Sequence, residues 1–223
     1  MMRPIPRTRI KICCISSEAE ARLAVRHGAS ALGLVSQMPS GPGVIPEALI
    51  AEIAAAVPPG IATFLLTGHQ DADAIIDQHR RCRTTTIQLC DAVTPTAYET
   101  IREALPGTGI VQVIHVAGEE SVAKALTASR FADALLLDSG RLELATKELG
   151  GTGRVHDWEI SRRIVAESRI AVYLAGGLNA ANVGGAIGTA APFGVDLCSG
   201  VRTGGRLDED KLTDFVEAVL DTS

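Results

Sequence analysis

The chain has 223 residues, of which 46% are hydrophobic and 21% charged, and its net charge is -5. This length suits one α/β barrel, and the apolar content excludes an intrinsically disordered chain. An acidic chain with one Trp, two Tyr and four Phe is a poor partner for nucleic acid. No apolar stretch has the length of a membrane helix, so we expect no membrane partner and a cytoplasmic location.

Short apolar runs recur along the chain and predict buried parallel strands. The eight runs are 9–15, 31–35, 61–66, 85–89, 110–116, 132–138, 170–175 and 194–199.

Between the runs, apolar residues recur at three- and four-residue steps, which predicts helices covering the strands, as in 18–27, 94–105 and 155–167. Ser17 with Glu20 fits a capping box, and Asn179 and Asp208 also mark helix starts. The repeated unit predicts an α/β fold, a (β/α)8 TIM barrel with a single domain over 1–223. An open doubly wound sheet is the alternative, which eight near-equal repeats disfavour.

The cysteines of the chain lie mostly inside apolar runs: Cys13, Cys14, Cys82, Cys90 and Cys198. Their number is odd and their spacing matches no zinc site, so we expect reduced thiols and no metal.

The first run carries Lys11 ahead of Cys13 and Cys14. Reacting groups of a barrel lie at the C-terminal ends of its strands, and alternation lets at most one of the two cysteines point along the interior toward the mouth. A lysine within a strand lowers the pKa of a nearby thiol, which favours a thiolate base. Alternatively, both cysteines are small core side chains.

Asp138 ends the sixth run, at the mouth of the predicted barrel. Together with a thiol on the first strand it offers an acid and a base in one pocket, as proton transfer requires. A loop-capping aspartate that accepts backbone N–H groups is the alternative.

Three glycine-rich loops occur in the last third of the chain, at 150–153, 176–179 and 199–201. Glycines after strands seven and eight allow backbone N–H groups to approach a phosphate, and barrels bind phosphate there. Tight-turn glycines are the alternative explanation. The pattern predicts a phosphorylated small molecule as the ligand.

The order of these motifs resembles the phosphoribosylanthranilate isomerase family over essentially the whole chain. Lys11-Ile12-Cys13-Cys14-Ile15-Ser16 is similar to that family's Lys-Ile-Cys-Gly-Ile-Thr opening. Segments 28–33, 87–89, 136–139, 150–153, 174–179 and 195–201 keep the family's order. The resemblance implies an isomerase of tryptophan biosynthesis, an intramolecular oxidoreductase of the aldose-ketose type that works without a cofactor.

The resemblance also implies roles for individual residues. Asp138 would protonate the furanose oxygen and Cys13 would remove the C2 proton. Backbone N–H groups around Gly176, Gly177, Ser199 and Gly200 would bind the phosphate. Further contacts to the substrate would come from Lys11, Gln88, Gly151 and Gly153.

Three loops depart from the family's pattern. The loop 36–43 lacks the basic residue expected after strand two, Cys90-Asp91 replaces His-Gly, and Arg202 replaces Glu. Arg202 or Arg154 would then bind the carboxylate of the substrate, since a guanidinium binds carboxylates bidentately. The alternatives are an isomerase or aldolase-type enzyme acting on another phosphorylated sugar, or a non-catalytic phosphosugar-binding protein. A homodimer is possible in each case.

Overall fold

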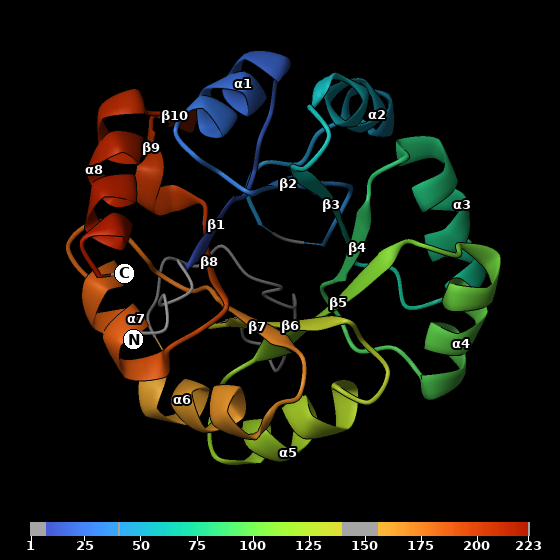
Figure 1. Cartoon of the computed structure of the whole chain (residues 1–223). Coiled ribbons are helices and arrows are strands. Elements are labelled where there is room, and N and C mark those ends of the chain that lie inside the picture. The colour runs from blue at the N-terminus through green and yellow to red at the C-terminus, as the bar shows by residue number, and fades with distance from the viewer. Residues whose placement is uncertain (1–7, 40, 140–155, 223) are drawn as a thin grey trace, which may run out of the picture.

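Eight parallel strands form a closed ring at the centre of the protein (Figure 1). This computed structural model describes residues 8–39, 41–139 and 156–222. Each strand pairs with the next, and β1 pairs with β8 to close the ring. The strands are β1 (Arg9–Ile12), β2 (Ala31–Val35), β3 (Ala62–Thr67), β4 (Thr86–Leu89), β5 (Gly109–His115), β6 (Ala134–Asp138), β7 (Ala171–Leu174) and β8 (Gly194–Leu197). The predicted (β/α)8 barrel is confirmed, and the alternative open sheet is excluded.

Helices surround the ring and alternate with its strands (Figure 1). They are α1 (Glu18–Arg26), α2 (Glu47–Ala56), α3 (Ala72–Cys82), α4 (Pro95–Ala104), α5 (Glu120–Ala128), α6 (Trp158–Glu167), α7 (Val183–Ala190) and α8 (Glu209–Leu220). A short turn, η1 (Ser199–Val201), and a small hairpin of β9 (Arg202–Thr203) and β10 (Arg206–Leu207) separate β8 from α8. No helix among residues 8–39, 41–139 and 156–222 is long and apolar enough to cross a membrane.

The polar residues expected at helix starts act as caps in two of three cases. Ser17 caps α1 by accepting from the backbone N–H of Glu20, and Asp208 caps α8 by accepting from that of Lys211. Asn179 does not begin a helix, because α7 starts four residues later; its side chain accepts from the N–H of Ala181 in the preceding loop instead.

β1 ends three residues and β8 two residues earlier than the apolar runs predicted. β1 stops at Ile12 because Cys14 has a positive φ of 61°, which no strand residue adopts. β8 stops at Leu197 because Ser199 already belongs to the turn η1. Cys13 and Cys198 therefore lie just beyond their strands, at the mouth of the barrel.

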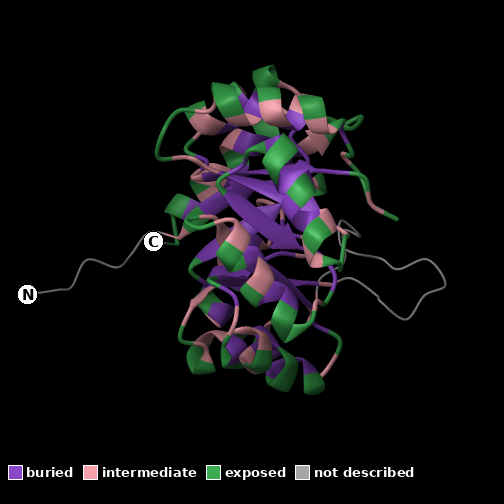
Figure 2. Cartoon of the chain, turned by 90° about the vertical axis from the view of Figure 1, so that its right-hand side faces the viewer, coloured by how far each residue is buried: buried purple, intermediate pink, exposed green. Residues whose placement is uncertain are grey.

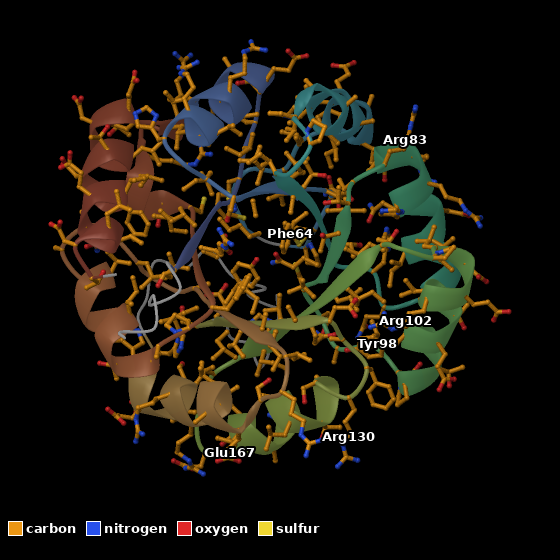
Figure 3. The ribbon with its side chains drawn as sticks, viewed as in Figure 1. Phe64, Arg83, Tyr98, Arg102, Arg130 and Glu167 are labelled. Atoms are coloured by element: carbon orange, nitrogen blue, oxygen red, sulfur yellow. The ribbon has the colours of Figure 1, made fainter. Side chains whose placement is uncertain are left out.

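The core has two layers, one between the sheet and the helices and one inside the ring. Outward-facing strand residues such as Ile12, Leu135 and Val195 pack against the buried faces of the helices. The strands are almost wholly buried, whereas the outer faces of the helices are exposed (Figure 2). Inside the ring, Phe64 contacts Tyr173 edge-on, with ring centroids 6.0 Å apart, near the barrel centre (Figure 3). This filled interior leaves the ring of strand ends as the place for a ligand.

Candidate active site

Cys13 lies at the mouth of the barrel, close to the side chain of Lys11. Both side chains point inward, since they are two residues apart at the end of β1. A Cβ atom placed on Gly33 of β2 would lie 2.8 Å from the Cys13 sulfur and 3.1 Å from the Lys11 nitrogen. Only glycine fits between them, so β2 leaves the thiol and the ammonium group side by side. Cys13 itself is 7% exposed.

Lys11 is completely buried and is paired within the protein. Its Nζ donates to Asp196 of β8 at 2.9 Å and lies 5.1 Å from the centre of the Phe64 ring. Burial alone would lower the pKa of Lys11, but the carboxylate of Asp196 raises it above its usual value. We expected Lys11 to contact the substrate directly. The structure instead places this cation in the barrel interior, as a fixed positive charge beneath the thiol.

Asp138 ends β6 at the same mouth and is 8% exposed. Burial raises the pKa of its carboxyl above the usual value, and this effect exceeds the opposing hydrogen bond from the N–H of Ser139, which is 2.7 Å long. Among neighbouring charges, His115 and Lys11 lower the pKa, whereas Asp196 raises it. A carboxyl that retains its proton at higher pH is suited to the role of general acid.

His115 ends β5 and is the direct partner of Asp138 in the β5–β6 ladder. Its Nε2 lies 3.1 Å from the carbonyl oxygen of Cys90, so this nitrogen carries a proton and donates it. Its Nδ1 is buried and has no hydrogen-bond partner among the described residues. The strand-end rule that singled out Asp138 applies equally to this histidine, which the sequence analysis missed.

Asp196 was missed for a related reason. It lies within β8, and its role depends on Lys11, which is 185 residues away in the sequence. No local sequence pattern predicts a pair between residues so far apart.

Cys14 departs from the alternation of the strand and lies against the loop after β2. Its sulfur is 3.7 Å from the carbonyl oxygen of Pro42. A Cβ atom on Gly43 would lie 2.5 Å from the Cys14 Cβ, so the two backbones approach each other closely. Hydrogen bonding to Cys13 and then to Cys198 raises the pKa of the Cys14 thiol, and burial raises it further. This buried thiol is unsuited to act as the base.

Arg202 has partners other than the expected substrate carboxylate. Its Nη1 donates to Glu20 and to the carbonyl oxygen of Gly205, both at 3.0 Å. Its Nη2 donates to Glu20 at 3.1 Å and to the carbonyl oxygens of Cys14 at 2.6 Å and Cys13 at 3.3 Å. The side chain is 8% exposed. Both terminal nitrogens are therefore hydrogen-bonded inside the protein, whereas the buried Nε has no partner among the described residues. That Arg202 binds the substrate carboxylate stays a prediction, which the bonds of the terminal nitrogens disfavour.

The two loops expected to bind phosphate lie against each other. Gly176 and Gly177 follow β7 with φ values of 88° and 63°, a conformation that favours glycine. A Cβ atom on Gly200 would lie 2.1 Å from the carbonyl oxygen of Leu178, so the backbone after β8 touches the backbone after β7. The side chain of Asn182 donates to the carbonyl oxygen of Gly177 at 2.9 Å and fixes the first loop.

Ser199 opens the turn after β8, next to Gly200. The four residues expected at the phosphate, Gly176, Gly177, Ser199 and Gly200, are therefore brought together on two touching loops.

Gln88 lies inside the barrel on β4 and is 3% exposed. Its Nε2 is 3.8 Å from the Cys90 sulfur, and its Oε1 has no hydrogen-bond partner in the described part of the chain. Burial raises the pKa of the Cys90 thiol to about 12, so Cys90 stays protonated at neutral pH. The expected substrate contacts of Gly151, Gly153 and Arg154 lie outside the described residues.

A closed barrel with an acid, a thiol and two glycine loops at the C-terminal ends of its strands defines a barrel enzyme. The family described as N-(5'phosphoribosyl)anthranilate (PRA) isomerase matches residues 10–218. The chain belongs to this family, whose members are aldose-ketose isomerases of tryptophan biosynthesis.

Individual relatives agree with this assignment. The N-(5'-phosphoribosyl)anthranilate isomerase of Methanocella arvoryzae is 33% identical over 95% of this chain and 98% of its own length. Isomerase 2 of Methanosarcina mazei is 37% identical over 93% and 92%. The crystal structure of phosphoribosyl anthranilate isomerase from Thermotoga maritima superposes with a TM-score of 0.82 at 27% identity, covering 96% of this chain and 99% of that one.

Proposed function

We propose that this chain isomerises N-(5'-phosphoribosyl)anthranilate to the carboxyphenylamino-deoxyribulose phosphate, with Asp138 as general acid and Cys13 as general base. The observation that carries these roles is their placement. Asp138 ends β6 and Cys13 follows β1, so the two groups face the same mouth from strands that are not neighbours in the ring. A sugar between them can lose a proton on one side and gain one on the other.

The charges around each group favour its role. Burial raises the pKa of Asp138, which keeps a proton available for the furanose oxygen. Breaking the bond between that oxygen and C1 gives an iminium ion, and the Cys13 thiolate then removes the C2 proton to give an enolamine. The buried ammonium of Lys11 places a positive charge beside the sulfur that would receive the proton. The enolamine tautomerises to the aminoketone, and a proton leaves Cys13 as one returns to Asp138.

The loops after β7 and β8 are the proposed phosphate site. Gly176 and Gly177 have the backbone conformation that turns N–H groups outward, and Gly200 allows the second loop to approach the first. A solved isomerase that is 25% identical, with a TM-score of 0.80 over 96% of this chain and 99% of that one, is described in complex with reduced 1-(O-carboxyphenylamino)-1-deoxyribulose 5-phosphate. That ligand carries the phosphate group this site would bind.

The terminal nitrogens of Arg202 already bond to groups of the protein, which disfavours Arg202 as the partner of the substrate carboxylate. Of the two arginines expected for this role, Arg154 is the favoured candidate. The amide oxygen of Gln88, inside the barrel, has no hydrogen-bond partner among the described residues. We propose that Gln88 contacts the substrate from β4.

The decisive experiment uses enzymatically generated phosphoribosylanthranilate, whose fluorescence disappears on isomerisation. Purified protein should remove the fluorescence, and the Asp138→Asn variant should not, because an amide cannot deliver an acidic proton. Absence of turnover in the unmodified protein would favour the alternative, an isomerase acting on another phosphorylated sugar. The cytoplasmic location and the homodimer stay predictions, and sedimentation of the purified protein tests the latter.

A further inference from the structure

The Arg202 guanidinium connects two parts of the chain that are far apart in sequence, the segment after β8 and the segment from the end of β1 into α1. It bonds to Glu20 at the start of α1 and to the carbonyl oxygens of Cys13 and Cys14 after β1, from its own position after β8. A guanidinium suits this position because its planar donors can serve a carboxylate and carbonyl groups together.

Cys14 is held in an unfavourable backbone conformation. Its φ of 61° lies in the left-handed region, where the Cβ of an L-residue crowds the following carbonyl oxygen. Two contacts oppose relaxation: the loop after β2 packs against the side chain at Gly43, and Arg202 bonds to the backbone carbonyl at 2.6 Å. The conformation of Cys14 sets the direction in which the chain leaves Cys13.

Glu20 fixes the orientation of the guanidinium. Its two carboxylate oxygens each accept from Arg202, and they also accept from the backbone N–H groups of Ser16 and Leu207. Burial opposes ionisation, but the bonds from Arg202 and from these N–H groups lower the pKa of Glu20 below its usual value. Glu20 is therefore charged at neutral pH. Together with the carbonyl oxygens of Gly205, Cys13 and Cys14, it holds the arginine against the loop that carries Cys13.

We propose that Arg202 is a positioning residue for the catalytic thiol: it stabilises the left-handed conformation of Cys14 and thereby holds Cys13 in the geometry needed to remove a proton. The proposal rests on the proposed function insofar as Cys13 is the base. It predicts that Arg202 and Cys14 are energetically coupled, since a residue without a Cβ adopts the same conformation without such support.

A double-mutant cycle of Arg202→Lys and Cys14→Gly tests this coupling. Lysine keeps the charge opposite Glu20 but has one nitrogen, which cannot serve the carboxylate and both carbonyl groups. In the unmodified background we expect Arg202→Lys to lower kcat about tenfold to a hundredfold, because small displacements of a reacting group have effects of that size, and to change KM by less than about twofold. In the Cys14→Gly background we expect the same substitution to lower kcat by less than about threefold.

Equal losses of kcat in both backgrounds would overturn the proposal, as would a loss confined to KM, which would return Arg202 to substrate binding. Thermal unfolding of each variant identifies losses that arise only from unfolded protein. Arg163→Lys is the matched control, because Arg163 pairs with Glu119 on the exposed outer surface. Its kcat should equal that of the unmodified protein.

A second readout does not require the isomerase activity. The rate of Cys13 alkylation by iodoacetamide, measured by mass spectrometry, should change with Arg202→Lys in the unmodified background and much less in the Cys14→Gly background. If the protein does not isomerise phosphoribosylanthranilate but this pattern holds, the proposed function fails and the positioning role stands. An alkylation rate that is the same in all variants would overturn the positioning role itself.

Discussion

His115 and Asp138 face each other across the β5–β6 ladder, each at the last residue of its strand. Neighbouring strands are about 4.8 Å apart, so the imidazole of His115 lies beside the proposed acid. A positive charge on His115 lowers the pKa of Asp138, against the larger effect of burial. The charge of His115 therefore affects how much of the acid is protonated at a given pH, although less than burial does.

Replacing His115 should move the pH dependence of the reaction. In His115→Gln the positive charge is lost, while Lys11 and Asp196 keep their opposing effects on Asp138 and the N–H of Ser139 keeps its hydrogen bond. The pKa of Asp138 should rise, so the alkaline limb of kcat/KM should shift to higher pH. Steady-state rates between pH 5 and 10 measure this. An unmoved alkaline limb would show that His115 does not act on the acid.

Cys13→Ser should abolish isomerisation without unfolding the protein. A serine hydroxyl has almost no anionic form near neutral pH, so it serves poorly as a base, whereas the thiol is a far stronger acid than an alcohol. We expect kcat to fall by about a hundredfold or more, the range associated with loss of a general base. Cys82→Ser, a buried cysteine on α3 far from the mouth, is the control for the loss of a thiol. Near-normal turnover of Cys13→Ser would assign the base elsewhere.

Asp196→Ala should destabilise the protein strongly. It removes the hydrogen-bonded partner of Lys11 and leaves a fully buried ammonium group unpaired. Breaking a buried ion pair in this way costs about 3 to 5 kcal/mol in the free energy of unfolding, which urea denaturation measures. Glu18→Ala removes an exposed partner of Arg22 and should change stability by less than about 1 kcal/mol. Similar effects for the two variants would contradict the importance of the interior pair.

His156 should make the protein sensitive to mild acid. Burial lowers the pKa of His156 to about 4, despite the opposing charge of Asp157, and the unfolded chain binds this proton near pH 6.5. The unfolded state therefore binds more protons in this range. The stability that neutral His156 contributes is present above pH 6.5 and is lost as pH falls toward 4, by up to about 3 kcal/mol.

Urea denaturation at pH 7 and pH 5 measures this effect. The decrease in the free energy of unfolding should be smaller in His156→Leu. His69→Leu, on an exposed residue, should keep the full decrease. An equal decrease in all three proteins would remove His156 as the cause.

Local patterns predicted most of the fold. Apolar runs of strand length, separated by helix-period segments, placed every strand of the ring, and the strand-end rule placed Cys13 and Asp138 at the mouth. The end of β1 was predicted wrongly because the left-handed conformation of Cys14 depends on contacts from the loop after β2 and from Arg202. Such contacts are absent from the local sequence.

The hydrogen bonds of Arg202 within the protein were not predicted, for the same physical reason. Its position after β8 was predicted correctly. However, its guanidinium donates to Glu20, which lies 182 residues away in the sequence. A strand-end rule identifies which residues reach the mouth. It does not identify which N–H groups of those residues already donate hydrogen bonds to other groups of the protein.

The pairing of β1 with β8 joins the first strand of the ring to the last. During synthesis β1 leaves the ribosome long before β8, and Lys11 then has no Asp196 to pair with. Burying an unpaired lysine is costly, so an incomplete barrel disfavours enclosure of its own first strand. The interior ion pair thus ties closure of the ring to arrival of the final strand, and a nascent chain is kept from settling into a closed barrel of seven strands or fewer.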